Sequence, residues 1–148
     1  MNAEDLILIL ITIILYILSS LGLIGIAKQM NLKGGWMAWI PIINFYLIGK
    51  LAFNKNMGLA LLLLSIFSAS INEDHFALNN LLVSPVDEIV SLIFLISLVI
   101  SINQIYKKMS NKAAIMIVCT ILSLGIIAPI FLFVIRKNSV TLIDKPLN

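Results

Sequence analysis

Long apolar runs alternate with short polar stretches along the whole chain. The first run, about residues 6–27, is almost unbroken leucine and isoleucine, and at 1.5 Å per residue it matches a hydrocarbon core of about 30 Å. The same reading predicts three further transmembrane helices, at about 51–71, 86–106 and 113–135. The predicted fold class is therefore all-α, a polytopic bundle of four helices.

Two prolines bear on the predicted helix ends and bends. Pro85 follows Ser84, which suits a serine N-cap with proline at the first position of the third helix. Pro129 lies inside the fourth predicted helix and would kink it, because proline lacks an N–H and clashes with the preceding turn. Gly125, one turn earlier, gives room to bend. We therefore expect Gly125 and Pro129 either to serve as packing features or to form a hinge.

A fifth apolar segment, residues 34–49, follows the first predicted span and contains GGWMAWIPIINFY. Its glycine pair and Pro41 interrupt any continuous spanning helix. Trp36, Trp39 and Tyr46 combine apolar rings with a polar N–H or O–H, which suits the headgroup level of a membrane. We predict a short helix in the membrane plane, a break at Pro41, and a second helix from about Asn44 that leads into the second span. Five residues form the predicted membrane anchor: Trp36, Trp39, Pro41, Asn44 and Tyr46. A re-entrant hairpin is the alternative.

The distribution of lysine and arginine separates two topologies. If 34–49 crossed the membrane, five of these residues would lie on each side. If it stays on one side, seven lie on one face and three, Arg136, Lys137 and Lys145, on the other. The second arrangement follows the positive-inside rule. It predicts cytoplasmic loops at 28–55 and 107–112 and places both termini outside, although Arg136 and Lys137 then fall on the wrong side.

Composition strengthens the membrane assignment. The chain of 148 residues is 61% hydrophobic and 11% charged, against about 45–50% and about 25% in soluble domains. This length allows a single integral membrane domain, 1–148, in the cell membrane. The net charge of +3 comes from lysines beside apolar runs, so we expect them to face lipid headgroups rather than nucleic acid.

Few residues could perform chemistry. The predicted spans hold no Asp, Glu, His, Lys or Arg away from their ends, which argues against proton-coupled transport and intramembrane proteolysis. The single histidine, His75, lies in an acidic loop that we interpret as solvated rather than metal-binding, and the single cysteine, Cys119, can form no disulfide within the chain. We therefore predict no catalytic residues, no metal and no cofactor.

Small and polar residues inside the predicted spans favour helix packing. Gly22 and Gly25, three residues apart, would let another helix approach closely. A sharper alternative is that Asn44, Asn103 and Gln104 together line a polar vestibule at the cytoplasmic end of the bundle.

The segment from Gly35 to Lys50 resembles a group of small, largely uncharacterised bacterial integral membrane proteins. Its residues fit the juxtamembrane signature GWxAWIPxxNxYxLxxK, after one long span and before further apolar segments. The resemblance covers about residues 6–72 and implies a helical membrane protein without known catalytic residues.

Three functions fit these observations. The first is a non-enzymatic protein that binds lipid or another membrane protein, of an accessory, immunity or envelope-stress type. The second is an oligomeric transporter or channel for a small solute, since four helices enclose little space in a monomer. The third is a lipid-handling enzyme at the cytoplasmic interface, for which the sequence offers no nucleophile or acid–base pair. We predict the first, with the bilayer and either a membrane protein or a second copy of the chain as partners.

Overall fold

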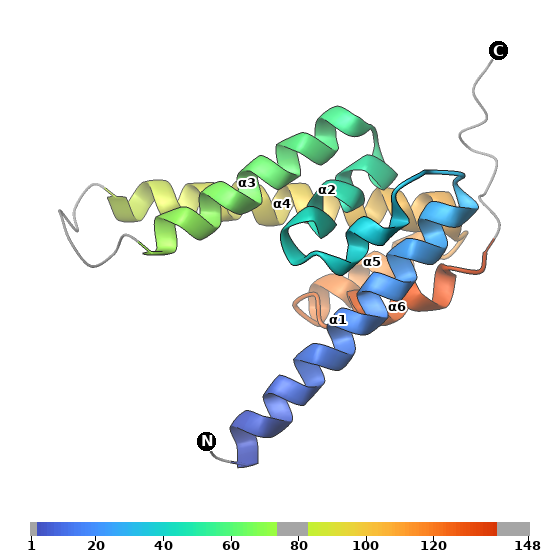
Figure 1. Ribbon diagram of the computed structural model, residues 1–148, viewed down its shortest axis with the longest axis horizontal. Coiled ribbons are helices and arrows are strands. Elements are labelled where there is room, and N and C mark those ends of the chain that lie inside the picture. Colours follow the sequence, from blue (N-terminus) through green and yellow to red (C-terminus); the bar gives the residue numbers. More distant parts are fainter. Residues whose placement is uncertain (1–2, 74–82, 139–148) are drawn as a thin grey trace.

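The computed structural model describes residues 3–73 and 83–138, and that part of the chain is helical (Figure 1). Six α-helices and one 3-10 helix follow each other along it: α1 (Ala3–Gln29), η1 (Gly35–Trp39), α2 (Pro41–Ala52), α3 (Lys55–Glu73), α4 (Val83–Met109), α5 (Ala113–Leu122) and α6 (Ala128–Ile135). The all-α prediction is confirmed for these residues.

Two helices are long and apolar enough to cross a membrane. They are α1, over Glu4–Gln29, and α4, over Glu88–Met109. Each contains a predicted span and extends it by a few residues at both ends. The apolar runs therefore located these two helices correctly.

The segment after α1 forms two helices separated by Pro41. Gly34 has a φ of 99°, after which η1 makes a short turn and Pro41 occupies the start of α2, where a missing N–H costs nothing. Ser20 Oγ on α1 donates a hydrogen bond to the Ala38 carbonyl at 2.9 Å and so holds η1 against α1. The predicted order of a short helix, a break at the proline and a second helix is confirmed, except that the second helix begins at Pro41, whereas its place in the membrane plane stays a prediction.

α2 and the next helix are not continuous. The chain breaks at Phe53 and Asn54, and Asn54 Oδ1 accepts a hydrogen bond from the Met57 N–H at 3.0 Å, which caps the start of α3. The helix at the predicted second span, α3, therefore begins at Lys55 rather than near Leu51. α3 then pairs with α4, and the hydroxyl oxygens of Ser68 and Ser91 lie 3.4 Å apart between them.

The predicted single helix over 113–135 is wrong. The chain leaves helical geometry at Leu124 and Gly125, whose φ angles are 52° and 86°. The Gly125 N–H donates to the Thr120 carbonyl at 2.8 Å and the Leu124 N–H donates to the Ile121 carbonyl at 3.0 Å, which is the Schellman pattern that ends a helix. Pro129 does not kink a helix, because it lies in the first turn of α6.

After this turn the chain returns to the end of the molecule from which α5 starts. Asn138 Nδ2 donates a hydrogen bond to the Met109 carbonyl at 2.9 Å, so the residues after α6 lie beside the end of α4. α6 also packs along α1 in the same direction, with Gly22 beside Leu132 and Gly25 beside Arg136. The close approach predicted for the two glycines is confirmed.

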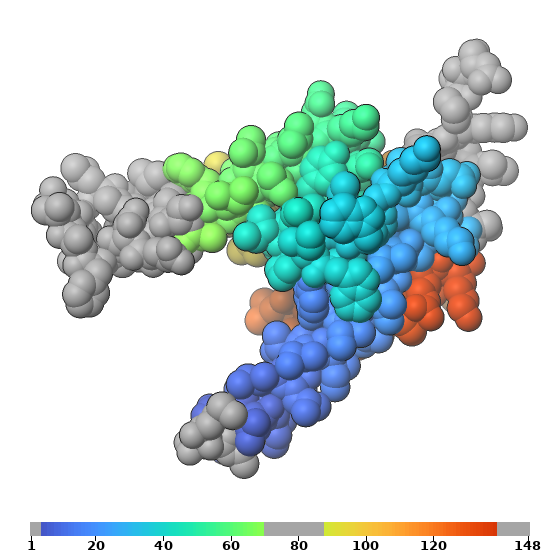
Figure 2. All heavy atoms as spheres, viewed as in Figure 1, coloured from blue at the N-terminus to red at the C-terminus, as the bar shows by residue number. Residues whose placement is uncertain are grey.

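The buried core occupies one end of the molecule, where the second halves of α1 and α4 meet the shorter helices. Its largest fully buried side chains include Tyr106, Leu23, Leu47 and Ile105. Away from this core, the first half of α1 and the α3–α4 pair diverge and expose apolar side chains (Figures 1 and 2).

Basic and acidic residues lie at opposite ends of the molecule, the basic ones at the end that holds the core. Nine of the ten lysine and arginine residues belong to the described part of the chain, and all of them lie at the core end, in the stretches 28–55, 107–112 and 136–137. Lys108 Nζ donates to the Leu51 carbonyl at 3.4 Å and so connects the second stretch with the first, and within the first stretch Lys50 Nζ donates to the Lys33 carbonyl at 3.2 Å. The acidic residues of the described chain lie at the far ends of α1, α3 and α4.

Candidate functional site

A cavity of about 560 Å³ lies where α1, α2, α4, α5 and α6 meet. This volume falls in the range of about 300–1,000 Å³ that is typical of ligand sites. Most of its lining is apolar and comes from α2, α4, α5, α6 and the turn between α5 and α6: Phe45, Ile48, Leu95, Leu98, Val99, Ile102, Ile121, Leu124, Ala128, Pro129 and Leu132. Ser19, Asn44 and Thr120 supply the polar side chains.

Asn44 stands out among these three. Its side chain is 8% exposed, and its Oδ1 accepts no hydrogen bond. An unsatisfied buried polar group costs about 1–3 kcal/mol. Asn44 therefore lacks a partner that a ligand in the cavity could supply.

The position of Asn44 is set by contacts of α2. The Asn44 N–H donates to the Ile40 carbonyl at 2.8 Å, which places Asn44 in the first turn of α2. The neighbouring Phe45 ring meets the Phe94 ring of α4 edge to face, with centroids 5.1 Å apart. This aromatic contact holds α2 beside the apolar face of α4 that forms one wall of the cavity.

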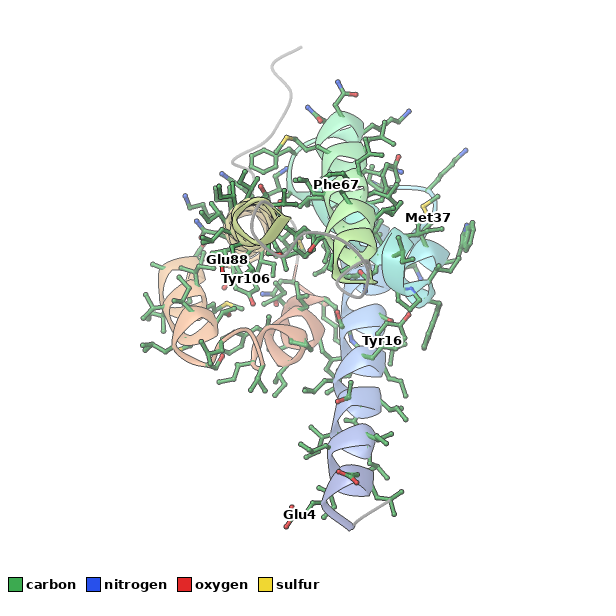
Figure 3. The ribbon with its side chains drawn as sticks, turned by 90° about the vertical axis from the view of Figure 1, so that its left-hand side faces the viewer. Glu4, Tyr16, Met37, Phe67, Glu88 and Tyr106 are labelled. Atoms are coloured by element: carbon green, nitrogen blue, oxygen red, sulfur yellow. The ribbon has the colours of Figure 1, made fainter. Side chains whose placement is uncertain are left out.

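Thr120 differs from Asn44 because its hydroxyl has partners. Thr120 Oγ1 donates to the Met116 carbonyl at 2.8 Å and lies 3.1 Å from the Tyr106 hydroxyl. Tyr106 is fully buried and lies on the side of α4 that faces α5 and α6 (Figure 3). Its ring also meets the Phe131 ring of α6 edge to face, at 6.1 Å. These contacts hold α5 and α6 against α4 and so shape the second wall.

The five residues predicted as a membrane anchor do not form one site. Trp36 is 63% exposed, and Trp39 and Pro41 are also exposed. Tyr46 is half-buried and has Lys50 Nζ 5.8 Å from its ring centroid. Only Asn44 lines the cavity.

The other predicted site residues divide in a similar way. Gly125 and Pro129 both line the cavity, so the candidate hinge is part of its wall. Asn103 and Gln104 are half-buried on α4 and do not line it, so the alternative of a vestibule shared with Asn44 is not this cavity. Sequence reasoning missed Ser19 and the wall formed by α4, because apolar residues on a helix give no sign of which face borders a cavity.

The lining contains no acid, base or thiol. Among the described residues, no three His, Cys, Asp or Glu side chains are grouped as a metal site would require. His75 lies outside the described residues. The expectation of no cofactor stays a prediction.

Comparison of the chain with known protein families, with curated proteins and with solved structures found no match. The resemblance of residues 35–50 to small bacterial membrane proteins therefore stays a prediction.

Proposed function

We propose that the chain is a multi-pass integral membrane protein that acts by binding a lipid or another membrane protein, without catalysis. The observation that carries this proposal is the division of the molecule into a cationic end and apolar helices that project from it. α1 and α4 are long enough to span the bilayer, and their projecting halves expose leucine and isoleucine side chains. In water such a surface would drive aggregation, whereas hydrocarbon solvates it.

The cationic end belongs on the cytoplasmic face in this proposal. All nine described lysine and arginine residues then lie on one side, as the positive-inside rule requires. Arg136 and Lys137, which the four-span topology places outside, join the other cations because α6 returns toward the end of α4. The described acidic residues fall on the outer side.

This arrangement revises the four-span topology. α1, α3 and α4 cross the bilayer, and the α5–α6 pair enters from the cytoplasmic face and turns back. With 10 and 8 residues, α5 and α6 are about 15 Å and about 12 Å long, roughly half of the hydrocarbon core.

The turn between α5 and α6 would then lie near the middle of the hydrocarbon core, and its backbone suits that place. Irregular backbone within a membrane is tolerated where it is buried or lines a cavity and where its polar groups are satisfied. Ser123 Oγ donates to the Thr120 carbonyl at 3.0 Å and accepts from the Ile127 N–H at 3.3 Å. Leu124 and Gly125 border the cavity.

Segment 34–49 enters the membrane from the cytoplasmic face in this proposal. Tyr16, in the middle of α1, donates its hydroxyl proton to the Trp39 carbonyl at 2.6 Å, so η1 is fixed beside the central part of α1. Lys50 Nζ donates to the Lys33 carbonyl, which keeps both ends of the segment at the cationic end. These contacts favour the re-entrant alternative over a helix that lies at the headgroup level.

Binding rather than catalysis is favoured by the lining of the cavity. Its side chains contain no nucleophile with an adjacent base and no pair of titratable groups. A site of this composition can hold a molecule and present it, which is what an accessory protein requires.

Alkaline carbonate extraction of membranes tests the proposal. We expect the wild-type chain to stay in the membrane pellet. Because α3 and α4 are further spans in this proposal, the variant Ile14→Lys, which puts a charge on an exposed position in the middle of α1 at a cost of roughly 2.5–3.5 kcal/mol of insertion, should also stay in the pellet. Release of the wild-type chain into the supernatant contradicts the proposal.

A further inference from the structure

We propose that the cavity between α2, α4 and the α5–α6 pair binds a neutral amphiphile, an apolar chain that carries one uncharged hydroxyl, and that Asn44 is its hydrogen-bonding partner. The inference rests on the proposed membrane location, which supplies ligands of this kind from the bilayer.

The walls select the apolar part of the ligand. Leu95, Leu98, Val99 and Ile102 lie along one side of α4, and Ala128 and Leu132 of α6 contribute to the same lining. A cavity of about 560 Å³ lined in this way gains from filling with hydrocarbon, because each buried methylene contributes about 0.8 kcal/mol when it leaves water.

Asn44 selects the polar part. The buried Oδ1 of Asn44 has no hydrogen-bond donor, so a ligand that satisfies it must supply an O–H or N–H group. A hydroxyl is a neutral group that donates such a bond. An ether or an alkane cannot donate to Oδ1.

A charged headgroup does not fit. No lysine, arginine, aspartate or glutamate lines the cavity, so an ionised group would lose its hydration without a counter-charge. The ligand is therefore neutral.

The open side of the cavity fits delivery from the membrane. Leu124, at the turn between α5 and α6, lines the cavity and is 91% exposed, and Leu95 on α4 is also exposed. In the proposed orientation this side opens at the depth of the acyl chains. An amphiphile in the bilayer can then enter with its chain without passing through water.

The full chain in lipid nanodiscs, labelled with a dodecanol that carries a photoactivatable diazirine on its chain, tests the inference. We expect cross-links to concentrate in residues 95–102 and 120–132. Dodecanol should compete with labelling roughly tenfold better than dodecyl methyl ether, which can accept but not donate a hydrogen bond.

The variant Asn44→Leu keeps a side chain of similar size but removes the amide. It should still be labelled, which shows that the cavity is folded, and it should lose the preference for dodecanol over the ether. Equal competition by the two compounds in the wild type, or a preference that survives in Asn44→Leu, overturns the inference.

A second pair of variants tests the location without touching Asn44. Val99→Phe puts a larger side chain into the cavity and should reduce labelling severalfold. Val118→Phe makes the same change on an exposed part of α5 outside the lining and should leave labelling unchanged. If the chain enters the nanodisc but the labelling is spread over the exposed surfaces of α1 and α4, the inference is overturned. Failure to enter nanodiscs would instead contradict the proposed function.

Discussion

Replacing Gly49 with alanine should lower the free energy of unfolding by about 3 kcal/mol, the upper part of the range for overpacking. A Cβ at Gly49 would lie 2.7 Å from the Met57 carbonyl oxygen and 2.8 Å from Gly58 Cα. Both are backbone atoms of α3, so no side chain can rotate away and α2 must separate from α3. Because α2 carries Asn44, Phe45 and Ile48, the cavity loses part of its wall at the same time.

Gly58 faces the same contact from the other helix, since a Cβ there would lie 2.6 Å from the Tyr46 carbonyl oxygen. The two glycines therefore act as a unit, and the loss in the double variant Gly49→Ala/Gly58→Ala should be smaller than the sum of the single losses by at least about 0.5 kcal/mol. Titration with SDS from a mild detergent measures the three values. The control Gly35→Ala, whose Cβ would lie at an ordinary 3.6 Å from Ile24 Cα, should change stability by less than about 0.5 kcal/mol. If the losses of Gly49→Ala and Gly58→Ala add up exactly in the double variant, or if Gly49→Ala is as stable as the wild type, α2 and α3 do not cross this closely.

Replacing Gly22 with alanine should lower the free energy of unfolding by about 2 kcal/mol. A Cβ at Gly22 would lie 2.7 Å from the Leu132 carbonyl carbon and 2.8 Å from the Phe133 nitrogen of α6. Within an exposed helix, glycine to alanine raises stability by up to about 1 kcal/mol, so the predicted loss has the opposite sign to the helix propensity. The cause can only be the contact with α6.

The measurement is the same SDS titration. We expect the larger Gly22→Val to cost more than Gly22→Ala, because the side chain grows toward the backbone of α6. If Gly22→Ala raises stability, α6 does not pack on α1 and the return of the α5–α6 pair to the cationic end is wrong.

The long apolar runs sufficed to predict α1 and α4, because an apolar stretch of that length has few stable structures other than a helix. The break between α2 and α3 escaped the same reading, since Phe53 and Asn54 interrupt the apolar pattern only briefly. Asn54 could have indicated it, because asparagine before a helix is a common N-cap and its side chain caps α3.

The main error of the sequence-based prediction was the course of the chain after α5, which was expected to continue as one helix to residue 135. Pro129 drew attention as a helix breaker, yet proline near a helix start is unstrained, and the break lies at Leu124 and Gly125. Gly125 is a residue that adopts positive φ readily, whereas leucine does so rarely, so nothing in the sequence marks Leu124 as a position of positive φ just after α5.

Part of the cavity could be predicted. Asn44 was selected as part of the interfacial segment and of a possible polar vestibule, and Gly125 and Pro129 were selected for their effect on the backbone; all three line the cavity. The α4 wall could not be predicted, because which face of an apolar helix borders a cavity depends on how the helices cross. The crossing of α2 and α4 is set by contacts such as Phe45 with Phe94, which lie far apart in the sequence.

The return of the α5–α6 pair to the cytoplasmic face is the central claim of the topology, and cysteine accessibility in intact cells tests it most directly. In a Cys119→Ala background, single cysteines are placed at Glu4, Asn31, Asn111 and Asn138. We predict that a membrane-impermeant thiol reagent labels only the Glu4 position in intact cells and labels the other three after the membrane is opened. Labelling of the Asn138 position in intact cells would show that residues 113–135 cross the bilayer and would contradict the account.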